Sequence, residues 1–204
     1  MKNVKRLITA LGVAGIAMAL MLLGSGVSGA AENSYIGVKE CAKCHKKDKE
    51  GKQEAIWEKS KHSEAFKNLG TPKAKERAAK VGVTTDPQKS EACLVCHTAG
   101  AGEPADRFDK KFEMENGVQC ENCHGAGSEY KKKKTMEKIS EERGKDKKGV
   151  SATAKEVGLI IPDENTCKTC HAEQINYKGK VYKNPSYEAF DFKKSWDKIK
   201  HPIP

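Results

Sequence analysis

Apolar residues are unevenly distributed along this chain. Residues 7–23 form one long apolar run, whereas the rest of the chain mixes apolar and charged positions closely. Over the whole sequence, 37% of the residues are hydrophobic and 32% are charged. Because burial of apolar surface drives folding, a core built from these side chains alone would be thin.

The N-terminal apolar run has the flanks of a secretory signal peptide. The basic residues Lys2, Lys5 and Arg6 precede it, and the small residues Ser28-Gly29-Ala30 follow it. This order predicts export and cleavage after Ala30. The run is also at the short limit for a membrane span, so a retained anchor is the alternative. We expect residues 1–30 to be removed and residues 31–204 to form one domain in the periplasm or outside the cell.

Helical periodicity is clearest at 52–69, where one face carries Ala55, His62, Ala65, Phe66 and Leu69. Gly70 is a stop signal, and Thr71-Pro72 predicts the start of a second helix. A short helix is also predicted over 192–200. It would end at His201, because Pro202 cannot continue it.

The eight cysteines lie in four copies of one pattern, C-x-x-C-H, which attaches c-type haem. Two thiols bond to vinyl groups on one porphyrin edge, and the adjacent imidazole binds the iron. The pattern predicts four covalently bound haem c groups. The attaching residues would be Cys41, Cys44, Cys93, Cys96, Cys120, Cys123, Cys167 and Cys170, and the proximal iron ligands His45, His97, His124 and His171.

Zinc sites, redox dithiols and disulfides also use closely spaced cysteines. None of them requires a histidine after every second cysteine. We therefore predict a mainly α fold with extensive irregular loops, in which four haems form the core of a multihaem cytochrome c.

The sixth iron ligands are limited by the histidine count. The chain has six histidines, and only His62 and His201 lie outside the motifs. Both are candidate distal ligands; the alternatives are a core histidine and a frayed terminal residue. At most two haems can then have two histidine ligands. We expect an open iron at His97, and at His171 an iron that is open or bound by Met136.

Charge gives less information. The formal net charge is +10, part of which lies in the signal peptide. Lysines cluster at 131–134, within a charged segment that extends to Lys148. This segment is either a solvated loop or a docking patch for an acidic redox partner. A nucleic-acid partner is excluded because the exported chain has no recognition motif.

The chain resembles the tetrahaem cytochrome c-554 family over most of its mature length. The similarity is carried by Gly37–His45, Ile56–Phe66, Gly117–Gly127 and the order of the four motifs. The resemblance implies a small, mainly helical periplasmic electron carrier with haems in close stacked pairs. It would place His201 opposite the first haem and His62 opposite the third. In one respect the chain departs from the family, because residues 125–166 contain no histidine where a distal ligand is expected.

Electron transfer between redox partner proteins is the leading function, since no hydrolytic or phosphate-binding constellation is present and no catalytic residue is assigned. Two alternatives remain open. One is an enzyme that reduces a small nitrogen oxide at an open-sided iron, and the other is a subunit of an extracellular haem filament.

Overall fold

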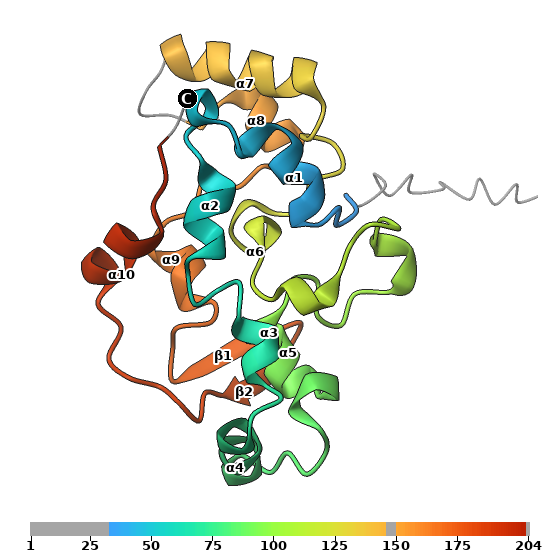
Figure 1. The fold of residues 1–204 in the computed structure, drawn as a ribbon, viewed down its shortest axis with the longest axis vertical. Helices are drawn as coiled ribbons and strands as arrows, with labels where there is room; N and C mark the ends of the chain where they lie inside the picture. The colour runs from blue at the N-terminus through green and yellow to red at the C-terminus, as the bar shows by residue number, and fades with distance from the viewer. Residues whose placement is uncertain (1–32, 146–149, 203–204) are drawn as a thin grey trace, which may run out of the picture. The chain divides into compact units, whose positions relative to one another are not determined.

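The computed structural model describes residues 33–145 and 150–202 (Figure 1). The expected signal peptide, residues 1–30, lies outside the described residues. Within these two ranges no helix is long and apolar enough to cross a bilayer.

The described chain consists of short helices joined by irregular segments (Figure 1). The α-helices are α1 Val38–His45, α2 Gln53–Glu58, α3 Ala65–Asn68, α4 Pro72–Lys80, α5 Glu91–His97, α6 Cys120–His124, α7 Lys133–Lys145, α8 Ala152–Glu156, α9 Glu164–Lys168 and α10 Phe192–Ile199. The single-turn 3₁₀ helices are η1 Asp48–Glu50, η2 Pro87–Lys89, η3 Ala105–Arg107 and η4 Met114–Asn116. Strands β1 Gln174–Tyr177 and β2 Lys180–Lys183 form an antiparallel hairpin, with Gln174 opposite Lys183. The predicted mainly α fold with extensive loops is confirmed.

Two of the predicted helices begin as expected. In α4 the Thr71 side chain accepts a hydrogen bond from the Ala74 amide at 3.2 Å, and Pro72 occupies the first turn. In α10 the Asp191 carboxylate accepts a hydrogen bond from the Lys194 amide at 3.0 Å. Asp191 is therefore the N-cap of α10, a residue that was not predicted from the sequence.

The predicted continuous helix over 52–69 is wrong, because the chain turns between α2 and α3. Serine hydroxyls donate hydrogen bonds to backbone carbonyls at this break. Ser60 donates to the Trp57 carbonyl at 2.7 Å, and Ser63 donates to the Ser60 carbonyl at 2.8 Å. Such local bonds compete with the helical ladder. His62 consequently lies in the turn and not on a helix face.

The protein core is small, as its composition predicted. One apolar cluster joins Val95 of α5 to Ala101 and to Ile175 of β1. A second cluster joins Tyr130 to Ile139 of α7 and Ala154 of α8. Neither cluster is large, so little apolar surface is buried by side chains alone.

A buried polar tie joins the start of the described chain to α6. The Glu121 carboxylate accepts hydrogen bonds from the amides of Ile36 at 2.9 Å, Gly37 at 2.8 Å and Gly127 at 2.7 Å. Glu121 is only 3% exposed. The buried Gln119 side chain accepts from the Val38 amide at 2.8 Å. These bonds hold α1 beside α6.

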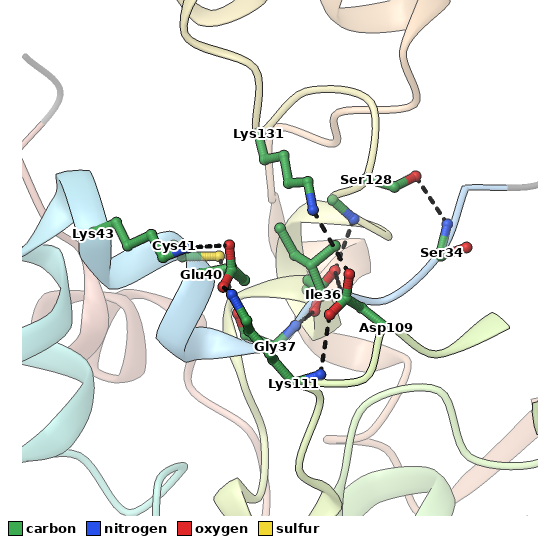
Figure 2. A network of polar contacts seen from close by, with 12 residues as sticks. Ser34, Ile36, Gly37, Glu40, Cys41, Lys43, Asp109, Lys111, Ser128 and Lys131 are labelled. Carbon is green, nitrogen blue, oxygen red and sulfur yellow. Dashed lines mark hydrogen bonds and ion pairs between the residues drawn. The ribbon is translucent and has the colours of Figure 1, made fainter.

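Exposed contacts surround this tie (Figure 2). Ser34 and Ser128 bond to each other, with the Ser34 amide 3.0 Å from the Ser128 hydroxyl. The Glu40 carboxylate, at the start of α1, pairs with Lys43 at 2.7 Å and with Lys111 at 2.9 Å. These two lysines hold the pKa of Glu40 at about 2, well below its usual range.

The basic segment after the third motif is largely the helix α7, not a loop. Acidic side chains lie beside several lysines of this basic segment. Lys132 pairs with Glu129 at 2.7 Å, and Lys133 pairs with Glu137 at 3.5 Å. Much of the positive charge expected of a docking patch is therefore compensated locally. Residues 146–149 of this segment lie outside the described residues.

Candidate haem-binding sites

Each C-x-x-C-H motif lies in or at the end of a short helix. The first two motifs are the C-terminal ends of α1 and α5, the third is the whole of α6, and the fourth continues from α9 through a turn to His171. One helical turn places residues three apart on the same side, so the two thiols of a motif can face one porphyrin edge. All eight cysteines are free, so the disulfide alternative is not what the structure shows.

The motifs meet in pairs through their thiols. The thiol of Cys41 in the first motif lies close enough to Cys120 of the third for the two to interact. Cys96 of the second motif lies as close to Cys170 of the fourth. These interactions, together with burial, raise the pKa of Cys41 and of Cys96. The first motif is therefore beside the third, and the second is beside the fourth.

Four of the six histidines form two facing pairs. The ring centroids of His62 and His171 are 6.1 Å apart, and those of His124 and His201 are 5.9 Å apart. Two imidazoles bound to opposite sides of one metal ion, each by a bond of about 2 Å, have centroids roughly 6 Å apart. Each pair therefore leaves the space that one iron requires.

These pairs differ from those implied by the family resemblance. His201 faces His124 of the third motif, not His45 of the first. His62 faces His171 of the fourth motif, not the third. The expectation of a fourth iron that is open or bound by Met136 stays a prediction, and the structure places the ring of His62 6.1 Å from that of His171.

Hydrogen bonds orient two of the motif imidazoles. His97 Nδ1 is 2.8 Å from the Ala65 carbonyl, and His124 Nδ1 is 2.9 Å from the Ile160 carbonyl. Each carbonyl accepts the Nδ1 proton, so Nε2 is left with a lone pair for a metal. Burial lowers the pKa of His62, His97, His124 and His171. Burial thus favours the neutral imidazole, the form that binds iron.

An open cavity of about 420 Å³ lies beside His171. Phe190 stacks on the His171 ring with centroids 4.8 Å apart, and Lys194 and Lys198 of α10 line the cavity wall. An apolar plate bearing two carboxylates suits such surroundings, since lysines pair with carboxylates. The residues present fit a haem. Phe190 as a neighbour of His171 was not predicted from the sequence.

The remaining candidates lie elsewhere. Met136 of α7 packs against the cluster of Tyr130, Ile139 and Ala154. Met114 begins η4, and its carbonyl accepts a hydrogen bond from the Thr98 hydroxyl at 3.0 Å. Sequence analysis also missed the buried Glu121, although a carboxylate inside a C-x-x-C-H motif was visible.

Gly117 packs against the His62 main chain. Its φ is +72°, and an added Cβ would lie 2.7 Å from the His62 carbonyl oxygen. The amide of Val118 donates to the same oxygen at 3.0 Å. The glycine is therefore required both by its backbone conformation and by space.

Gly117→Ala is expected to destabilise the holoprotein by about 1–3 kcal/mol or more, since backbone strain of this kind costs that much. It is also expected to lower the fraction of low-spin iron, because the added methyl group would displace His62. Thermal unfolding and electron paramagnetic resonance would measure both. Gly82→Ala is the matched control, because Gly82 has φ +80° and nothing within 4 Å of an added Cβ. Equal effects in the two variants would show that contact with His62 plays no part.

Facing imidazoles beside C-x-x-C-H helices define a multihaem c-type cytochrome. The family model described as "Cytochrome c554 and c-prime" matches residues 40–125. The solved structure of the reduced state of cytochrome c554 from Nitrosomonas europaea is 25% identical, with a TM-score of 0.49, and the match covers 82% of this chain and 79% of that one. The curated cytochrome c-554 of Nitrosomonas europaea is 31% identical over 172 residues, which are 82% of this chain and 69% of the relative.

The chain belongs to the cytochrome c-554 family, and the resemblance found in the sequence is confirmed. It is a c-type cytochrome that takes part in electron transfer. It carries covalently attached haem c, and members of this family carry four such haems.

Proposed function

We propose that this chain is an exported tetrahaem cytochrome that carries electrons between redox partner proteins through closely packed haems. The observation that carries the proposal is the two pairs of facing imidazoles, with centroids 6.1 Å apart at the fourth motif and 5.9 Å apart at the third. When bound, haem c supplies an iron that alternates between the ferric and ferrous states.

The eight motif cysteines attach the haems, and His45, His97, His124 and His171 are the proximal ligands. His62 is the distal ligand of the fourth haem and His201 that of the third. The carbonyls of Ala65 and Ile160 support this scheme by fixing the Nδ1 protons of His97 and His124. Imidazoles that are already oriented need not reorganise when the iron changes its charge, which favours electron transfer.

The contacts between motifs support an order of transfer. The first motif is beside the third through Cys41 and Cys120, and the second is beside the fourth through Cys96 and Cys170. Cys123 of the third motif is close enough to Cys167 of the fourth for their charges to interact. Electrons would thus pass along the order first, third, fourth, second.

Export to the periplasm is part of the proposal and rests on the signal-peptide pattern of residues 1–30. Covalent haem attachment also takes place outside the bacterial cytoplasm. The partners are other redox proteins, and exposed lysines would contribute through long-range attraction more than through fixed contacts.

The mature protein is expected to have the mass of the chain from Ala31 plus four haems after denaturation, and to take up four electrons per chain. Mass spectrometry of the denatured protein and a reductive titration followed in the visible spectrum would measure these values. Thioether bonds keep the porphyrin on the chain, so release of haem into acid acetone would contradict covalent attachment. A start before Ala31 would contradict only the cleavage site.

A second candidate function is reduction of a small nitrogen oxide at an open-sided iron. The observation that favours it is His97, whose ring has no other histidine facing it among the described residues. Turnover of nitric oxide with a chemical reductant, lost when cyanide is bound, would support this function over simple electron transfer.

A further inference from the structure

Glu121 is the one charged side chain that is buried in the part of the chain that the structure describes. It lies inside the third motif, directly after Cys120. Its two oxygens accept hydrogen bonds from three backbone amides, at 2.7 to 2.9 Å. Such donors stabilise the charged form of a carboxylate, and here they act against the burial that raises the pKa of Glu121. The cation that acts on Glu121, Lys131, is exposed and also pairs with Asp109 at 3.8 Å.

The same carboxylate lies beside the first motif. Two of its three donors, the amides of Ile36 and Gly37, lead directly into α1, which carries Cys41. The pKa of Cys41 is raised mainly by its contact with Cys120 and by burial, and the charge of Glu121 raises it further. The charge of Glu121 acts in the same direction on Cys120. Its field therefore reaches a haem-attaching sulfur in both the first and the third motif.

The acidic residues beside the fourth motif, by contrast, are exposed. The charges of Asp163 and Glu164 act on Cys167. Both side chains are open to water, and Glu164 pairs with Lys168 at 2.7 Å. Water and salt screen an exposed charge strongly, whereas they screen a buried charge much less. An equal charge should therefore have a larger effect at Glu121 than at Glu164.

We propose that Glu121 lowers the reduction potentials of the first and third haems together. This inference rests on the haem attachment and electron transfer proposed above. Reduction adds one electron from a redox partner to a ferric iron, and a nearby negative charge makes that gain less favourable. The first and third haems form one end of the order first, third, fourth, second. Electrons would therefore settle preferentially on the fourth and second haems.

The experiment compares haem potentials in the holoprotein with those in Glu121→Gln, which removes the charge and nearly keeps the shape. In a reductive titration followed by electron paramagnetic resonance, the potentials of the first and third haems should rise, and the other two should change little. The signal of the first haem is the one that C41S/C44S lacks, and the low-spin signal of the third is the one that His201→Ala removes. Glu164→Gln is the matched control, because it removes an exposed carboxylate beside the fourth motif. It should shift the potential of the fourth haem less than Glu121→Gln shifts the other two.

Glu121→Asp separates the charge from the packing, and it decides the question even if Glu121→Gln does not fold. The shorter side chain keeps the charge but reaches fewer amides, so stability should fall while both potentials stay low. A rise of both potentials in Glu121→Asp would overturn the proposal, because lost packing would then explain the shift. A shift spread equally over all four haems would also overturn it. Four haems by mass with unchanged potentials in Glu121→Gln would overturn the tuning role alone and leave the proposed electron transfer standing.

Discussion

His62→Ala is expected to turn one low-spin haem of the four into a high-spin haem and to raise cyanide uptake by one equivalent per chain. The reason is the 6.1 Å separation of the His62 and His171 rings, which is the spacing of two imidazoles that share one iron. Electron paramagnetic resonance of the oxidised protein would count the irons. An unchanged spectrum would mean that His62 is a core histidine.

His201→Ala is the matched comparison, because His201 faces His124 at a similar distance, 5.9 Å. Each variant should affect a different haem, so the double variant should contain two additional high-spin irons. The variant C167S/C170S cannot attach the fourth haem. Adding His62→Ala to this variant should therefore leave the spin states of the remaining haems unchanged. An effect that persists would assign His62 to another haem.

Glu121→Gln is expected to lower the free energy of unfolding of the holoprotein by about 1–3 kcal/mol. The carboxylate accepts from three backbone amides, those of Ile36, Gly37 and Gly127. A glutamine has one acceptor oxygen, and its NH₂ group would face at least one of these N–H donors. A buried donor would then be left without an acceptor. Denaturant unfolding followed by the visible absorption of the haems would measure the change.

Glu129→Gln is the control for this variant. Glu129 is exposed and pairs with Lys132 at 2.7 Å. Exposed ion pairs contribute only about 0.2–1 kcal/mol, so the control should change stability little. If both variants behave alike, the buried tie between α1 and α6 does not limit stability. A larger loss in Glu121→Gln would also predict weaker coupling between the first and third haems, because Glu121 holds their motifs together.

The sequence alone determined the number and type of cofactors. Covalent attachment depends on a local pattern of five residues, so four copies of C-x-x-C-H predict four haems without knowledge of the fold. The limit of two paired-histidine haems is likewise a count of residues. The start of the helix at Thr71-Pro72 and the end of the helix before Pro202 were predictable, because caps and prolines act on their own neighbours.

Only the tertiary structure decided which imidazole faces which motif. A distal ligand comes from a distant part of the chain, and its place depends on where intervening turns direct it. Periodicity alone assigned His62 to a helix face. The serine hydroxyls that end α2 instead turn the chain, so that the His62 ring faces His171. In the same way, the three amides bound by Glu121 come from segments on both sides of the motif, so α1 lies beside α6 because of contacts that no local pattern specifies.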